Sequence, residues 1–218
     1  MKITAIVPDG KTKSKIYLDG EYAGFLWNRE LAGSSLTEER ELTDAEWRDL
    51  VETAILPRGR KKALDLLLVQ ERSRKELEDK LLASGYTSEQ TNCVMQYVEQ
   101  FPYLDDVRYA LHYFCGAGKR KSFRQMQYEL RGKGVSERDI SEAYERYLMQ
   151  QQEEQEGAEP QEEPYERRDA EKAAIRRQVE KKFRNCCPEA EDWERLYASL
   201  ARKGFRGEDI LEVFREYR

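Results

Sequence analysis

The sequence has few cysteines and almost no histidine, which narrows the chemistry that the chain can perform. Its four cysteines are Cys93, Cys115, Cys186 and Cys187, none in a Cys-x-x-Cys pair, and His112 is the only histidine. This spacing does not suggest a four-ligand zinc site. A Ser-His-Asp or Cys-His catalytic centre is also disfavoured, because each needs a well-placed histidine. We therefore expect reduced thiols and no catalytic residue, metal or cofactor.

Long apolar runs are also missing. No stretch approaches the roughly 18 consecutive apolar residues that suggest a transmembrane helix. The first ten residues, MKITAIVPDG, contain no long apolar run before a small-residue cleavage site and so do not resemble a signal peptide. We expect a cytoplasmic protein that has no membrane partner.

Charge is abundant and unevenly distributed. The net charge is −5, yet residues 57–75 carry seven basic and two acidic side chains, and residues 108–133 carry seven basic and one acidic. Residues 149–166 carry seven glutamates and no lysine or arginine. Because local fields decide binding, the acidic average does not exclude an anionic partner.

The beginning of the chain predicts a small antiparallel sheet. Residues 3–7, 15–18 and 22–27 are rich in β-forming residues. Asp19-Gly20 separates the last two runs, and both residues of such a turn readily take a positive φ. A capping box at residues 43–46 then begins a helix, and Pro57-Arg58-Gly59 interrupts its pattern.

A repeat organises the rest of the chain. Residues 73–98, 122–147 and 192–217 align without gaps. Each copy has two apolar positions four residues apart, which share one helix face, and then a glycine followed by an apolar residue. The glycine suits a left-handed helix end, so each copy predicts a helix, a tight turn and a second helix. Ser73, Ser122 and Asp192 align as predicted N-caps. The first apolar position is Leu77, Met126 or Leu196, and the second is Leu81, Leu130 or Leu200. The aligned glycines are Gly85, Gly134 and Gly204.

A further helix is predicted before each copy, at residues 61–70, 106–118 and 167–183. The fold class is therefore mainly α: three tandem three-helix, helix-turn-helix-like repeats in an elongated array, behind a small β-hairpin or meander. We predict that residues 1–56 form a β-rich extension plus a helix. Residues 57–103 form repeat one, 104–148 repeat two and 167–218 repeat three. Residues 149–166 form an acidic linker that is disordered or loosely helical.

Two dense basic groups around repeats one and two are the candidate binding residues for a partner or for DNA. Lysine and arginine neutralise phosphates, and a helix N-terminus adds affinity for anions. The alternative interpretation is an ordinary solvated helix surface. The group around repeat one contains Arg58, Arg60, Lys61, Lys62, Arg72, Arg74 and Lys75. The candidates drawn from the two groups are Arg72, Arg74, Lys75, Lys119, Arg120, Lys121, Arg124, Arg131 and Lys133.

The ordered motifs together resemble the RecX family of regulatory proteins over residues of about 60–218. The motifs are Arg72-Ser73-x-x-Glu76-Leu77, Leu81-x-x-x-Gly85-Tyr86, Tyr103-Leu104-Asp105-Asp106-x-Arg108-Tyr109-Ala110, Glu129-Leu130-Arg131-x-Lys133-Gly134-Val135 and Arg202-Lys203-Gly204-Phe205. The N-terminal Leu18-Asp19-Gly20-Glu21 segment is similar to the extension of longer members. Ser122 stands where the pattern is expected to have glycine.

The resemblance implies a non-enzymatic protein that binds along the groove of the RecA–DNA filament. It would reduce ATP hydrolysis, strand exchange and co-protease activity, with some weak, electrostatic affinity for single- or double-stranded DNA. An alternative is a helix-turn-helix transcriptional regulator that acts on DNA directly. That function would call for a symmetric dimer, whereas tandem copies in one chain favour a monomer. A nuclease is a third possibility, but the sequence shows no metal-binding constellation.

Overall fold

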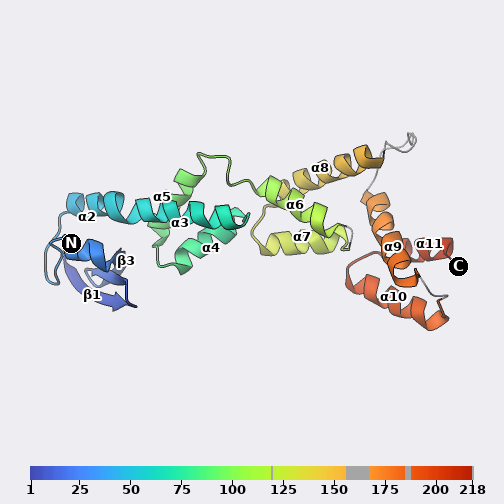
Figure 1. The fold of residues 1–218 in the computed structure, drawn as a ribbon, viewed down its shortest axis with the longest axis horizontal. Coiled ribbons are helices and arrows are strands. Elements are labelled where there is room, and N and C mark those ends of the chain that lie inside the picture. Colours follow the sequence, from blue (N-terminus) through green and yellow to red (C-terminus); the bar gives the residue numbers. More distant parts are fainter. Residues whose placement is uncertain (119, 156–166, 185–187, 218) are drawn as a thin grey trace. The chain divides into compact units, whose positions relative to one another are not determined.

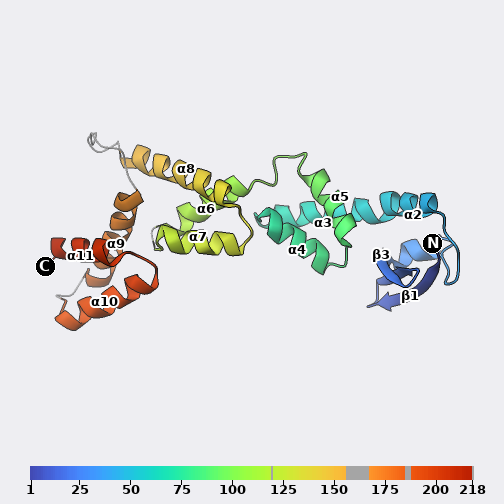
Figure 2. The same cartoon turned by 180° about the vertical axis from the view of Figure 1, so that it is seen from behind.

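The computed structural model describes residues 1–118, 120–155, 167–184 and 188–217. The chain divides into two compact units, Met1–Asp105 and Asp106–Arg218. The fold is mainly helical with a small antiparallel sheet at the N-terminus, as predicted (Figures 1 and 2). Within the described ranges, no helix combines the length and apolar character that crossing a membrane requires.

The N-terminal sheet is the predicted meander. Strands β1 (Ile3–Asp9), β2 (Lys13–Leu18) and β3 (Glu21–Trp27) pair antiparallel in the order β1-β2-β3. Between β2 and β3, Asp19 and Gly20 have φ values of +50° and +87°. Two consecutive positive φ angles match the right-handed twist of the flanking strands, so the local sequence sets this turn.

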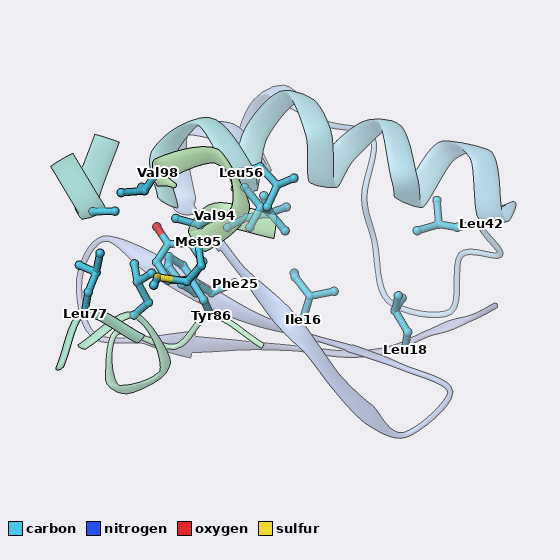
Figure 3. Packing of buried hydrophobic residues seen from close by; sticks show 14 of the residues in the cluster. Ile16, Leu18, Phe25, Leu42, Leu56, Leu77, Tyr86, Val94, Met95 and Val98 are labelled. Carbon is cyan, nitrogen blue, oxygen red and sulfur yellow. The ribbon is translucent and has the colours of Figure 1, made fainter. Parts of the chain in front are cut away.

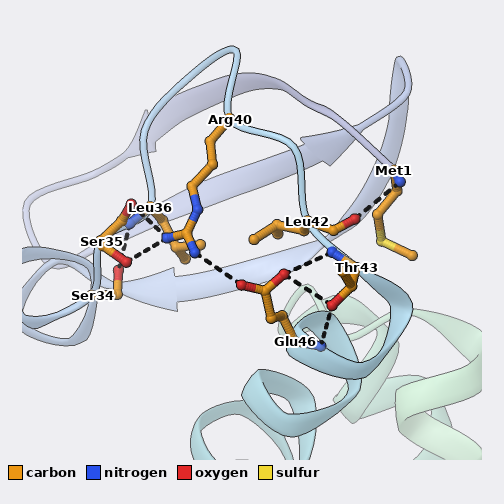
Figure 4. Close-up of polar contacts among 8 residues, drawn as sticks. All are labelled: Met1, Ser34, Ser35, Leu36, Arg40, Leu42, Thr43 and Glu46. Atoms are coloured by element: carbon orange, nitrogen blue, oxygen red, sulfur yellow. Dashed lines mark hydrogen bonds and ion pairs between the residues drawn. The ribbon is translucent and has the colours of Figure 1, made fainter.

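After β3 the chain forms the short helix α1 (Asn28–Gly33), and a polar network fixes it where it enters α2 (Asp44–Leu50). The Thr43 hydroxyl accepts from the Glu46 N–H at 3.2 Å, and the Glu46 carboxylate accepts from the Thr43 N–H at 2.8 Å (Figure 4). Hydrogen bonds from the Thr43 backbone and hydroxyl lower the pKa of Glu46, and Arg40 adds an ion pair at 3.1 Å. The chain's amino group donates to the Leu42 carbonyl at 3.1 Å. The predicted capping box is therefore confirmed.

The interruption predicted at Pro57-Arg58-Gly59 is wrong. A π-helical stretch (Val51–Ile55) follows α2 directly, and α3 (Leu56–Val69) continues from it. Proline lacks an N–H but fits the first turn of a helix. The change from π to α register just before Pro57 places the proline in that first turn, so the helical path continues through it.

Gly59 allows α3 to approach α5 (Ser88–Val98) closely. A Cβ atom at Gly59 would lie 2.6 Å from Cγ2 of Val94 and 3.2 Å from Cε1 of Tyr86. A larger residue would therefore push the two helices apart. In place of the interruption expected at residues 57–59, Gly59 lies within α3 and makes room for the neighbouring helix.

The sheet and the first repeat share one hydrophobic core. Ile16 and Phe25 from the sheet lie with Leu56 of α3 and Val94 of α5 in a single buried cluster (Figure 3). An isolated three-stranded sheet is marginal in water, and this shared core gives it a surface to pack on.

Three three-helix groups carry the repeat. The first contains α3, α4 (Arg74–Ala83) and α5; the second contains α6 (Asp106–Ala117), α7 (Phe123–Gly132) and α8 (Glu137–Gln155); the third contains α9 (Arg167–Phe183), α10 (Ala190–Arg202) and α11 (Gly207–Glu216). The second and third groups have separate buried clusters. Helix α8 extends into the segment predicted as an acidic linker, while residues 156–166 of that segment, like Cys186 and Cys187, lie outside the described residues.

A left-handed glycine ends the second helix of each group, as predicted. The φ values are +102° at Gly85, +79° at Gly134 and +83° at Gly204. The N–H of the next residue donates to the carbonyl five residues earlier, which is the Schellman pattern. These bonds are Tyr86 to Leu81 at 3.4 Å, Val135 to Leu130 at 3.1 Å and Phe205 to Leu200 at 3.3 Å.

The predicted N-caps are partly confirmed. Ser73 and Ser122 each accept a hydrogen bond from the N–H three residues on. Asp192 is not a cap, because α10 begins three residues earlier than its counterparts and Glu189 occupies the cap position. The Asp192 carboxylate instead accepts from the Glu189 N–H at 3.2 Å, from inside the first turn.

Replacing Gly59 with alanine is expected to lower the free energy of unfolding by about 1–3 kcal/mol, because the added methyl group overpacks the contact between α3 and α5. Gly116→Ala is the matched control, since it lies in α6 with nothing within 4 Å of its added Cβ. That change should be neutral or stabilising by up to about 1 kcal/mol. Urea unfolding followed by circular dichroism measures both. Unchanged stability of Gly59→Ala would contradict the close approach.

Candidate partner-binding surface

Arg120 and Arg124 are the most available of the predicted binding residues in the second repeat. Both are exposed, Arg120 in the loop between α6 and α7 and Arg124 in the first turn of α7. The Arg120 guanidinium donates to the Gly116 carbonyl at 3.3 Å. Among the described residues, neither arginine has a carboxylate within ion-pair distance. Lys119, predicted with them, lies outside the described residues.

Lys121 is instead held within its own three-helix group. Its ammonium donates to the Glu129 carboxylate at 2.5 Å and to the Tyr113 hydroxyl at 3.0 Å. The bond to Glu129, followed by the one to Tyr113, raises the pKa of Lys121. Burial alone would raise the pKa of Glu129, but hydrogen bonds from Lys121 and Tyr113 outweigh it and lower that pKa. The positive charge of Lys121, which the sequence predicts to bind a partner, is therefore paired with Glu129 inside the repeat.

The remaining predicted residues of the second repeat also have internal contacts. Arg131 forms an ion pair with Glu137 at the start of α8. The Lys133 ammonium lies 5.6 Å from the centre of the Tyr109 ring, which suits a cation–π contact. Both side chains therefore help join the helices of the second repeat.

The predicted residues of the first repeat differ in their surroundings. Arg74 pairs with Glu99, which joins the beginning of α4 to the end of α5. The Lys75 ammonium lies 2.9 Å from Asp79 on the same helix, and that hydrogen bond raises the pKa of Lys75. The Nε atom of Arg72 is buried and has no hydrogen-bond partner. None of the three combines exposure with an unpaired charge as Arg120 and Arg124 do.

The N-terminus of α7 is predicted to attract an external anion, but a carboxylate of the chain itself lies there. The Phe123 N–H donates to the Glu171 carboxylate of α9 at 3.1 Å. The Ser122 hydroxyl accepts from the Gln125 N–H at 3.3 Å and donates to the Lys203 carbonyl at 3.0 Å. An external anion would therefore meet side chains here rather than a free helix end. Glu171 is not among the residues predicted from the sequence, because no local pattern links residues so far apart in the chain.

The third repeat uses its basic residues to join two helices. Three ion pairs link α9 to α11, with steps of four residues on α9 and of three and four residues on α11, which places them along one face of each helix. The pairs are Arg168–Asp209 at 3.2 Å, Lys172–Glu212 at 2.6 Å and Arg176–Glu216 at 2.7 Å. Because steps of three and four residues keep side chains on one helix face, the spacing of these bases and acids is a detectable signal in the sequence. This face of α9 is consequently neutralised within the repeat.

The chemistry available on this surface is charge recognition. Within the described ranges, no group of three or more histidine, cysteine, aspartate or glutamate side chains could hold a metal ion. The exposed cations instead suit an anionic partner, with a strength that depends on salt.

Two segments of the chain match known domains. Residues 60–97 match the family described as "RecX, first three-helix domain", and residues 169–214 match "RecX, third three-helix domain". These ranges correspond to the first and third three-helix groups of the fold. The family comparison therefore matches the first and third copies of the repeat that the sequence pattern predicts.

Whole-chain relatives and solved structures agree with these matches. "Regulatory protein RecX" of Clostridium tetani is 26% identical, covering 97% of this chain and 92% of the relative. Its namesake from Levilactobacillus brevis is 31% identical over 63% of this chain, an alignment that spans about half of that relative (52%). The chain is also similar in fold to "Crystal structure of regulatory protein RecX", with a TM-score of 0.55 at 22% identity, covering 97% of this chain and 98% of the other.

Replacing Glu129 with glutamine is expected to lower the free energy of unfolding by up to about 1 kcal/mol at pH 7, because the contact with Lys121 loses its charge. The folded-state pKa of Glu129 lies below its ordinary 4.5, so its contribution is present above that pH and is lost as pH falls through the folded value. Urea unfolding at pH 7 and pH 3.5 tests this.

The matched control is Glu145→Gln, which removes the same charge from an exposed position of α8. It should leave stability nearly unchanged at both pH values. A difference between Glu129→Gln and the unaltered chain that stays the same at low pH would refute the proposed electrostatic origin.

Proposed function

The chain belongs to the RecX family of regulatory proteins, and from this premise we propose that it regulates RecA by binding the RecA–DNA filament. Binding reduces the ATPase, strand-exchange and co-protease activities of the filament. The protein acts as a monomer and without catalysis of its own, so it regulates the filament by binding to it. Contacts to single- or double-stranded DNA within the filament are weak and electrostatic.

The observation that supports this proposal is the pair of exposed guanidiniums at Arg120 and Arg124, which have no ion-pair partner in the described part of the chain. Guanidinium groups suit carboxylates and phosphates because their planar donors can engage two oxygens at once. A RecA–DNA filament contains phosphate along its length and so offers such oxygens. The nine basic residues identified in the sequence remain candidates, and these two are the best placed of those described.

A repeated helical scaffold also suits an extended partner. Each repeat builds its own exposed surface on the same corner geometry, so contacts can be distributed along the chain. Many weak contacts then combine into useful affinity without any deep pocket. A regulator of this kind needs no active site, which fits the shortage of histidine in the sequence.

RecA-catalysed ATP hydrolysis on single-stranded DNA, with this protein titrated in, tests the proposal. The unaltered chain should inhibit at amounts stoichiometric with RecA or lower. Replacing Arg120 and Arg124 together by glutamate should raise the concentration for half-maximal inhibition by about tenfold, because two contacts to anionic groups become repulsive.

The control double variant replaces Arg146 and Arg195 by glutamate. It changes the net charge equally, and both arginines are exposed and pair with a glutamate four residues earlier on their own helix. Its inhibition should stay within about threefold of the unaltered chain. Absence of inhibition by the unaltered chain would overturn the function, whereas equal effects of the two variants would overturn only the assigned contact residues.

A further inference from the structure

A groove of about 400 Å³ lies between the N-terminal sheet and α3, within the first unit. Its basic lining residues are Lys13 from β2 and Arg58, Lys61 and Lys62 from α3, and Asp65 is its only acidic one. Lys13 is far from the other three in sequence and reaches them because the sheet packs against α3. The binding residues proposed above do not include this site.

Aromatic rings form the floor of the groove and position two of its cations. The Arg58 guanidinium lies 5.1 Å from the centre of the Trp27 ring, and the Lys13 ammonium lies 4.8 Å from that of Phe25. Phe25 in turn packs edge-on against Tyr86, with ring centres 5.0 Å apart (Figure 3). Burial raises the pKa of Tyr86 to about 12, so its hydroxyl adds no negative charge.

The unneutralised charge of the groove comes from two lysines. Arg58 forms an ion pair with Glu30, and the Lys13 ammonium lies 3.2 Å from Asp9. Lys61 and Lys62 are exposed, and within the described part of the chain neither has a carboxylate within 4.0 Å. The groove therefore combines a planar guanidinium, held over an indole ring, with two exposed ammonium groups.

We propose that this groove binds a short segment of single-stranded nucleic acid. The phosphates lie against Lys61 and Lys62, and one base stacks on the Arg58 guanidinium, which Trp27 supports from below. Unpaired bases stack on arginine planes and aromatic rings, and lysines follow the backbone. The volume falls in the range of sites that hold a small ligand or a single nucleotide.

An acidic peptide satisfies the lysines but gains little from the flat stack at Arg58. A nucleic acid duplex offers phosphates but keeps its base faces covered by their neighbours. The combination of free ammonium groups and a stacking plane therefore favours the single strand. This binding needs no RecA, so its failure is distinguishable from failure of the proposed regulation.

Fluorescence anisotropy of a labelled 15-nucleotide oligothymidylate, titrated with the full chain, measures the binding. Replacing Lys61 and Lys62 together by glutamate should raise Kd by about tenfold or more. The control replaces Lys181 and Lys182 by glutamate, an adjacent exposed pair on α9 with the same charge change, and should shift Kd by less than about threefold. Equal shifts in Kd for the two double variants would overturn the proposal and indicate nonspecific electrostatic attraction instead.

Arg58→Lys tests the stacking plane, because it keeps the charge and removes the flat group. It should weaken binding of oligothymidylate by about threefold or more while leaving an abasic strand of the same length unaffected. Equal weakening of both strands, or a duplex that binds as tightly as the single strand, would overturn base stacking. Displacement of the oligonucleotide by polyglutamate at equal charge concentration would assign the groove to an acidic peptide instead.

Discussion

Each three-helix group depends on one backbone constraint, the left-handed glycine that ends its second helix. A side chain at this φ would clash with its own backbone, so glycine is the residue that makes the turn without strain. The bond from the next N–H back to the preceding helix then fixes the corner. The residue carrying that N–H is apolar in all three copies and is buried at Tyr86, Val135 and Phe205. The constraint thus sets both the direction of the third helix and the closure of the core.

The same scaffold distributes its charges differently in each copy. Among the described residues, Lys61 and Lys62 of the first group and Arg120 and Arg124 of the second have no ion-pair partner, whereas three cations of α9 in the third group pair with acids of α11. The count of basic residues in a segment therefore does not measure the charge that a partner meets. What matters is whether a carboxylate of the chain lies within reach, which depends on helix packing.

Local rules explain how much the sequence could predict. The hairpin turn at Asp19-Gly20, the Ser73 and Ser122 caps and the glycine corners each depend on residues a few positions apart, and all were predicted correctly. The break expected at Pro57 is absent, because the helix changes from π to α register just before the proline, and local sequence rules do not reveal that change. Other contacts of the candidate site join residues distant in sequence, such as Phe123 with Glu171 of α9, so composition alone could not assign them.

Ser122 shows why a departure from a family pattern needs the structure to interpret it. Glycine at this position would supply no hydroxyl, whereas Ser122 both caps α7 and donates to the Lys203 carbonyl of the third repeat. Glu171 from the same repeat accepts from the next N–H. The third repeat thus satisfies the polar groups at the start of α7 and supplies the anion that the helix end favours. An external anion at this corner would meet exposed side chains, and binding of that kind would depend more on salt than binding at a closed backbone site.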